Sequence, residues 1–171
     1  MKWILIVAVS LAGLVALAAM IGLLLPKGHQ ASLALRVRRT PEQVWPVITN
    51  YADSPQWRGD IKAVERVADQ NGHPVWKETA ANGWAITLED AEVDPPRKLV
   101  RRIADPKLPF SGNWTFELSQ RGDECEIRVT ENAEVANPLF RLMSRMSDPS
   151  ATIRSYLTAL AGKFGEPPRL E

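Results

Sequence analysis

The chain has 171 residues, with 21 lysines and arginines against 20 aspartates and glutamates, so its net charge is close to zero. Without a basic field to attract phosphates, we expect no nucleic-acid partner. The single cysteine, Cys125, excludes an intrachain disulfide framework. The two histidines, His29 and His73, are far apart in the sequence, so they form no local metal cluster or triad, and we expect no metal and no cofactor.

An apolar run extends from Trp3 to Leu25, and Lys2 is the single charge among the first 25 residues. As a helix this run spans about 34 Å, slightly more than the hydrocarbon core of a bilayer. A cleaved signal peptide is the alternative, but the run continues past the small residues of "ALAA" without a cleavage site at its end. We therefore expect residues 1–27 to be a transmembrane anchor of a single-pass membrane protein.

The side of the membrane is less well marked. Basic residues after the run, from Lys27 to Arg39, favour a cytoplasmic position for the rest of the chain. Most of them fall in an expected strand, which leaves the orientation open. Residues 28–171 are enough for one domain with a sizeable core.

A short linker, residues 27–30, precedes a stretch in which apolar and polar residues alternate, "ASLALRVR" at 31–38. This alternation is typical of a half-buried strand. A helix is then expected to start at Pro41, because Thr40 is a capping residue and Gln43 completes a capping box. It ends within "NYADSP", where aromatic and proline residues are concentrated.

From residue 61 onward, apolar runs are separated by turn residues at short intervals. Asn71–Gly72 and Asn82–Gly83 are strong hairpin signals. Every connection is too short for a crossover helix, so consecutive strands must be antiparallel. Six strands are expected, at about 61–68, 74–81, 84–93, 98–104, 111–119 and 124–135.

The last segment, Pro138 to Phe164, has helical periodicity, and Asp148–Pro149 predicts a kink or short break within it. Two apolar stripes follow one another along it: Leu139, Leu142, Met143 and Met146, then Ile153, Tyr156, Leu157, Leu160 and Phe164. The concave face of the meander is the one large surface for such a helix. We expect an α+β fold in which a twisted, seven-stranded antiparallel sheet wraps around a long C-terminal helix.

This order of elements resembles the START-like superfamily, also called SRPBCC, and within it the polyketide cyclase/dehydrase-like group with the helix-grip fold. The motifs that carry the resemblance are "TPEQVWPVITNYADSPQW", "DPPRKLV", "GNWTFEL" with "TENAEV", and the closing "NPLFRLM…YLTALAGKFG". They cover most of residues 31–165. The resemblance implies a deep, largely apolar cavity between sheet and terminal helix, with Tyr51 and Trp57 near its mouth and Trp45 in the core.

Strand alternation indicates which side chains face that cavity. Glu131 falls on the apolar face of its strand, where a carboxylate is costly unless it contacts a ligand or lies beyond a bulge that returns it to solvent. Trp114 and Trp84 belong to apolar faces, whereas the direction of Trp76 and Glu78 is undetermined. In the last segment, Phe140 and Met143 either line the cavity or, the more common case, pack between helix and sheet.

Three functions are compatible with these residues. The first is a membrane-tethered module that binds a hydrophobic small molecule or lipid, oriented by a polar group such as Glu131. The second is a polyketide cyclase or dehydratase, with Glu131 or Glu78 as acid or base together with Tyr51 or Arg102. The third is an accessory domain with a filled cavity that contacts an unknown protein. We rank binding first, since histidine is absent from the expected wall.

Overall fold

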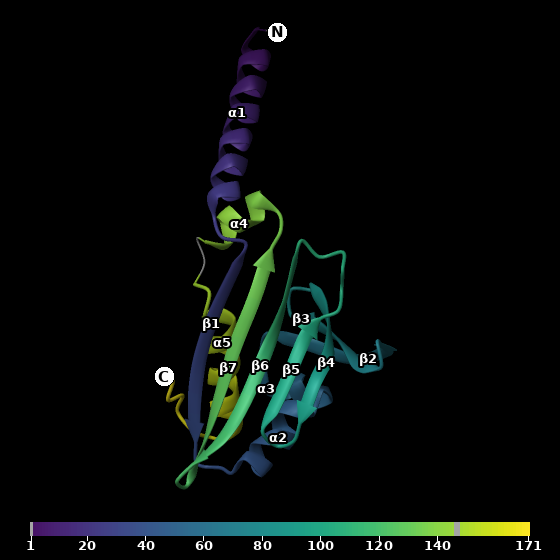
Figure 1. The fold of residues 1–171 in the computed structure, drawn as a ribbon, viewed down its shortest axis with the longest axis vertical. Helices are drawn as coiled ribbons and strands as arrows, with labels where there is room; N and C mark the ends of the chain where they lie inside the picture. Colours follow the sequence, from purple (N-terminus) through teal and green to yellow (C-terminus); the bar gives the residue numbers. More distant parts are fainter. Residues whose placement is uncertain (1, 146–147) are drawn as a thin grey trace.

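The computed structural model describes residues 2–145 and 148–171, so Met146 of the expected helical stripe lies outside the described residues. One long helix precedes the sheet, short helices follow the first strand, and two helices close the chain (Figure 1). The helices are α1 (Lys2–Leu24), α2 (Pro41–Thr49), the 3₁₀ turn η1 (Tyr51–Asp53), α3 (Ser54–Trp57), α4 (Pro138–Ser144) and α5 (Ala151–Lys163). The strands are β1 (Gly28–Val37), β2 (Ile61–Gln70), β3 (His73–Ala80), β4 (Ala85–Asp94), β5 (Lys98–Ile103), β6 (Phe110–Arg121) and β7 (Glu124–Val135).

The seven strands form one antiparallel sheet in the order β1-β7-β6-β5-β4-β3-β2. Strands β2 to β7 are the expected meander, and β1 joins its last strand, so that Leu35 lies opposite Ile127. Because each connection is short, neighbours in the sequence are also neighbours in the sheet. The α+β fold with a seven-stranded antiparallel sheet is therefore confirmed.

Helix α5 lies across the concave face of the sheet (Figure 1). Its fully buried residues Ile153, Leu157 and Leu160 pack in one core cluster with Leu35 and Ile127 of the sheet. The spacing of three and four residues places these side chains on one helix face, which is why this segment is buried on the sheet. The sheet and α5 together enclose the interior of the fold.

The chain departs from the expected linker at residues 27–30, because Gly28, His29 and Gln30 already belong to β1. Gly28 lies opposite Glu134 in the ladder with β7. Backbone pairing extends this strand beyond the part that carries an alternating apolar pattern, and backbone hydrogen bonds leave no trace in side-chain periodicity. The expected linker is thus wrong for most of its length.

Two further elements differ from the sequence predictions. The helix was expected to end within residues 50–55, but the 3₁₀ turn η1 and the short helix α3 continue the helical region as far as Trp57. The hairpin with Asn82–Gly83 is longer than a two-residue turn: Gly83 has φ of 86°, and Trp84 precedes the first residue of β4. At the other hairpin, Asn71 and Gly72 both have positive φ, as a type I′ turn requires.

The C-terminal segment is divided at the expected place, but its two halves do not share one surface. Helix α5 is on the sheet, whereas α4 lies against the end of α1 (Figure 1). Helix α1 projects away from the sheet and is long and apolar enough to cross a membrane, a property that signal sequences share. Helix α1 and the α4 helix that packs on it therefore form one end of the molecule.

Candidate functional site

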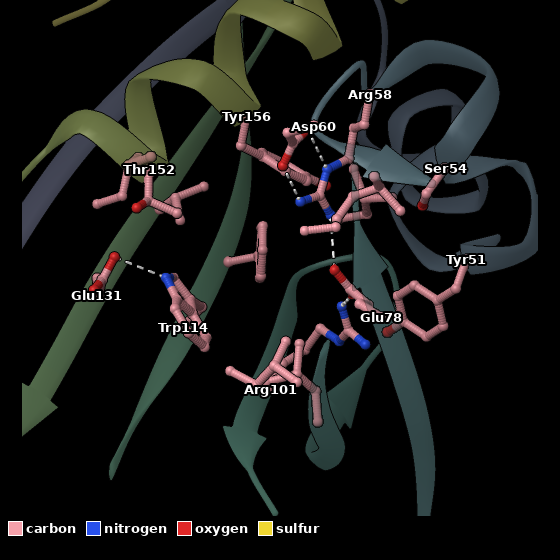
Figure 2. A pocket seen from close by; sticks show the side chains of 18 of the residues that line it. Tyr51, Ser54, Arg58, Asp60, Glu78, Arg101, Trp114, Glu131, Thr152 and Tyr156 are labelled. Atoms are coloured by element: carbon pink, nitrogen blue, oxygen red, sulfur yellow. Dashed lines mark hydrogen bonds and ion pairs between the residues drawn. The ribbon is translucent and has the colours of Figure 1, made fainter. Parts of the chain in front are cut away.

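A pocket with a volume of about 340 Å³ lies between the concave face of the sheet and α5. This volume is within the range of small-molecule sites, roughly 300–1,000 Å³. Most of its wall is apolar, and the polar side chains gather in two places, which Figure 2 shows on opposite sides of the pocket. The apolar wall consists of Ile48, Ile61, Ala80, Trp84, Ile86, Leu88, Phe110, Trp114, Phe116, Val129 and Ile153.

The larger polar group is centred on Glu78, a buried carboxylate of β3. Its Oε2 accepts a hydrogen bond of 3.1 Å from Nη1 of Arg58, and its Oε1 accepts one from Nη1 of Arg101. Arg58 follows α3 and also binds Asp60, with Nη2 and Oδ2 2.8 Å apart. Figure 2 shows these side chains as a continuous chain of interactions along one wall. We call Arg58, Asp60, Glu78, Asp90 and Arg101 the charged cluster.

Arg101 connects this cluster to the helical roof. Its Nε donates to Oδ1 of Asp90 over 3.2 Å, and the same oxygen accepts a 3.0 Å hydrogen bond from the Tyr51 hydroxyl. The Arg101 guanidinium also lies over the Tyr51 ring, with 4.0 Å between Cζ and the ring centroid. A buried charge is tolerated when it is paired and hydrogen-bonded in this way.

These contacts determine the protonation of the cluster. Burial raises the pKa of Glu78, but Arg101 and Arg58 together outweigh it and hold that pKa below its ordinary value. The pKa of Tyr51 is raised by burial, against the opposing effect of Arg101. At neutral pH the site therefore contains an ionised Glu78 and a protonated Tyr51.

Tyr156 of α5 also lines the pocket and lies beside Arg58 and Asp60 (Figure 2). Its ring lies edge-on to Trp57 and Phe116, with centroids 5.5 and 5.4 Å apart, and Arg58 Cζ is 5.3 Å from its centroid. Burial raises the pKa of Tyr156 although Arg58 opposes this, so the hydroxyl keeps its proton. Tyr156 thus adds a neutral hydroxyl to the lining of the pocket, on a ring held by aromatic packing.

The second polar group is Glu131 with Trp114. Both ladders of β7 run through Glu131 without a register shift, so no bulge returns this residue to solvent, and it lines the pocket. Its Oε2 accepts a 2.9 Å hydrogen bond from Nε1 of Trp114, and Oε1 is 3.8 Å from Nε2 of His29. Of the two alternatives open from the sequence, the structure selects the carboxylate that faces the cavity.

Five of the nine residues expected to contact a ligand line the pocket: Tyr51, Glu78, Trp84, Trp114 and Glu131. Their role in binding stays a prediction. The other four are placed elsewhere among the described residues.

Trp57, Trp76, Phe140 and Met143 are not among the residues that line the pocket, and their role in binding stays a prediction as well. Trp57 packs against Tyr156, and Trp76 packs edge-on against Tyr51 with centroids 5.0 Å apart, so both support lining residues without reaching the pocket. Phe140 and Met143 are exposed on α4, which packs on α1 instead of the sheet. An apolar stripe on a helix does not say which surface it will face, and the stripe of α4 does not face the pocket.

Sequence reasoning also missed part of the cluster. It named Arg102 as a candidate partner, but Arg102 points away from the pocket toward Glu89. Alternation along β5 places Leu99 and Arg101 on one face and Arg102 on the other, so the pattern contained the correct answer. Arg58 and Asp60 follow a short helix, where no periodicity indicates direction.

The ion pairs of the charged cluster limit what Glu78 can do chemically. Glu78 is held ionised by two arginines, which makes it a poor general base, because its affinity for a proton is reduced. Within residues 2–145 and 148–171, no group of three or more His, Cys, Asp and Glu side chains is placed to hold a metal ion. The pocket thus offers apolar surface and a set of ion-paired charges in which two arginines bind three carboxylates.

A seven-stranded antiparallel sheet that grips a C-terminal helix over such a pocket defines the helix-grip fold of the START-like superfamily. The chain belongs to the family described as polyketide cyclase/dehydrase and lipid transport, whose profile matches residues 29–162. No curated protein matches the sequence.

Solved structures share this fold at low sequence identity. The Zhui aromatase/cyclase from Streptomyces sp. R1128 is 12% identical with a TM-score of 0.66, over 80% of this chain and 93% of that one. Norcoclaurine synthase from Thalictrum flavum, in complex with dopamine and hydroxybenzaldehyde, is 13% identical with a TM-score of 0.64, over 80% and 86%. A START superfamily protein from Mycobacterium smegmatis is 20% identical with a TM-score of 0.58, over 79% and 96%. At these identities the likeness concerns the fold.

Proposed function

We propose that this protein binds an apolar small molecule that carries an uncharged polar group, and that α1 holds the binding domain, residues 28–171, at a membrane. The observation that carries the proposal is a largely apolar pocket with an ion-paired charged cluster on one wall. Burial of the apolar part of the ligand supplies affinity, and the few polar side chains fix its orientation.

The charges of the cluster favour an uncharged ligand. Its two arginines face three carboxylates, and each arginine is already bound to two of those carboxylates. An anionic ligand would compete with Glu78 for Arg58 and Arg101 and would leave this buried carboxylate unpaired, which is costly. A hydroxyl or carbonyl group adds no charge. It can accept a hydrogen bond from Tyr156 and leave the ion pairs intact.

The apolar anchor fits such a ligand. Molecules that suit a largely apolar pocket concentrate in membranes, and tethering raises the effective concentration of a binding site near its source. Helix α1 has the length and composition for this role, and its most apolar 18-residue stretch is not buried by the rest of the protein. The basic residues after α1 favour a cytoplasmic domain.

A matched pair of probes tests both parts of the proposal. N-phenyl-1-naphthylamine is uncharged, and 1-anilinonaphthalene-8-sulfonate adds a sulfonate to the same phenylaminonaphthalene frame. With the full chain in phosphatidylcholine nanodiscs, we expect energy transfer from protein tryptophan to the uncharged probe at a saturable site. We expect none to the sulfonate. Ala80→Trp, which fills the pocket from the same face of β3 without replacing a charged residue, is the control and abolishes the saturable signal.

Equal binding of both probes would contradict the charge argument, and a saturable signal that survives Ala80→Trp would place binding outside the pocket. Native mass spectrometry of the chain released from nanodiscs then identifies any ligand carried from the cell. A stoichiometric anionic lipid in the pocket would also overturn the proposal.

The other two functions have less support from the site. A cyclase or dehydratase needs a group that accepts a proton, and Glu78 is held ionised by its partners, whereas Arg102 is directed away from the pocket. Glu131 stays available as an acid or base beside Trp114. The accessory domain with a filled cavity is disfavoured by a pocket of about 340 Å³.

A further inference from the structure

The end of α1 is fastened to the folded domain by one buried side chain. Arg141 of α4 donates from Nη1 to the carbonyl oxygens of Gly22 and Leu25, over 3.0 and 3.1 Å. Its Nε and Nη2 donate to Val135 and Ala136 over 3.1 and 2.9 Å. The last carbonyls of a helix have no partner within the helix, so a guanidinium that caps them fixes the helix end. The anchor is therefore docked onto α4 and β7, in contrast to a flexible tether.

The same contact brings the two backbones very close. A Cβ atom built on Gly22 would lie 2.0 Å from the carbonyl oxygen of Pro138 in α4. Glycine is thus the residue that allows α4 to lie directly against the last turn of α1. Because the two backbones are in direct contact, packing sets the orientation of α4 relative to α1.

This docking leaves one face of α4 uncovered beside the anchor. Leu139, Phe140 and Met143 are exposed, and the side chain of Met143 retains 64% of its accessible surface. Leu23 and Leu24, at the end of α1, are exposed as well. Three exposed apolar residues on a seven-residue helix are unusual for a surface in water, and they mark contact with a partner or a membrane.

The pocket reaches the same end of the molecule. Val135, the last residue of β7, donates its backbone N–H to Lys27, just after α1, and lies opposite Phe110. Phe110 lines the pocket and contacts Trp84, with ring centroids 6.2 Å apart. Trp84 is a lining residue that is 48% exposed, so it belongs to the rim. Figure 1 shows α1, α4 and the β5–β6 connection together at this end.

We infer that the exposed face of α4 is embedded in the bilayer interface, and that the pocket exchanges its ligand with the bilayer across the Trp84–Phe110 side of its rim. This inference rests on the proposed membrane anchoring. The surface that covers this apolar face is a lipid bilayer, because α4 packs against the end of α1, the helix that enters the membrane. Apolar side chains of such a helix lie about 5–10 Å deep, at the boundary of headgroups and acyl chains.

Spin labels measure this depth in the full chain. Labels are placed one at a time at Met143→Cys, at Leu17→Cys within α1, and at Asp123→Cys in the β6–β7 turn, in vesicles of phosphatidylcholine and phosphatidylglycerol. The native Cys125 is buried, and burial raises its pKa to about 11, so it does not compete for the label. Oxygen and a water-soluble nickel chelate are the relaxation agents, because they partition into opposite phases.

We expect the label at position 17 to be relaxed by oxygen and protected from nickel, and the label at position 123 to show the reverse. The label at position 143 is expected to be relaxed by oxygen and shielded from nickel, at a shallower depth than position 17. Nickel access at 143 equal to that at 123 would overturn the inference while leaving the anchor intact. Nickel access at position 17 would instead contradict membrane anchoring, so the two failures are distinguishable.

Ligand exchange supplies a second readout. Phe140→Ser/Met143→Ser changes two exposed side chains outside the pocket, so folding and the saturable binding of N-phenyl-1-naphthylamine are expected to be unchanged. The rate at which the probe passes from preloaded vesicles to the protein is expected to fall. Val93→Ser, also an exposed apolar residue but at the far end of β4, is the control. Equal exchange rates for all three proteins would contradict the proposed route.

Discussion

The guanidinium of Arg101 lies on the face of the Tyr51 ring, 4.0 Å from Cζ to the ring centroid, in the interior of the domain. A cation over an aromatic face is attracted by the ring quadrupole, and the attraction is larger where water is excluded. Both residues also bind the same oxygen of Asp90. Tyr51, which follows α2, thus connects the helices above the pocket to the sheet through its contacts with the buried Arg101.

Replacement of this arginine should be severe. In Arg101→Met, Glu78 and Asp90 would lose their buried partner, and removal of one member of a buried ion pair costs about 3–5 kcal/mol of unfolding free energy. Arg97→Met is the control: Arg97 is 74% exposed, so its loss should change stability by less than about 0.5 kcal/mol. Denaturant unfolding followed by tryptophan fluorescence measures both variants. Equal stabilities would mean that the cluster is solvated in solution.

The charged cluster also predicts an acid-dependent loss of stability. Since Arg101 and Arg58 outweigh burial and hold the pKa of Glu78 below its ordinary value of 4.5, the unfolded chain takes up this proton first as the pH falls. The contribution of Glu78 is fully present above about pH 5.5 and is lost progressively below 4.5. The stability difference between wild type and Glu78→Gln should therefore shrink from pH 7 to pH 4. A difference independent of pH would argue against an ionised, paired Glu78.

The sheet could be predicted because side-chain alternation and turn residues are local signals. Alternation also placed Glu131 on the inner face, where the structure has it. The same rule applied to β5 would have found Arg101, but a charged residue on an apolar face is read as exposed unless its partners are known. Those partners come from β3 and β4, and their proximity is a property of the folded sheet.

Other parts of the site leave no periodic signal at all. Arg58 and Asp60 follow a four-residue helix, and only the packing of α3 brings them over Glu78. Likewise, the apolar stripe of α4 predicts that the helix is buried, but it does not indicate which element covers it. The contact of α4 with α1 depends on a missing Cβ at Gly22 and on a capping guanidinium, Arg141, neither of which is visible as a hydrophobic pattern.

Tyr156 should orient the ligand by its hydroxyl. In Tyr156→Phe the ring keeps its contacts with Trp57 and Phe116, so stability should change by less than about 1 kcal/mol. Loss of one donor to a ligand hydroxyl or carbonyl should weaken binding of the natural ligand about tenfold. N-phenyl-1-naphthylamine, which has no oxygen acceptor, should bind both proteins equally. If the variant weakens both ligands to the same extent, the hydroxyl acts through packing.

The docking of the anchor is testable by two glycines of the same helix. A Cβ at Gly22 would overlap the Pro138 carbonyl, whereas one at Gly13 would meet nothing within 4 Å. Both changes raise helix propensity equally, so Gly22→Ala should separate α1 from α4 while Gly13→Ala should have no effect. Spin labels at Val15→Cys and Asp123→Cys report the distance between the anchor and the far end of the sheet. We expect a narrow distribution in wild type and Gly13→Ala, and a broad one in Gly22→Ala. A broad distribution already in wild type would show a flexible tether and would remove the basis for a fixed orientation of the pocket toward the bilayer.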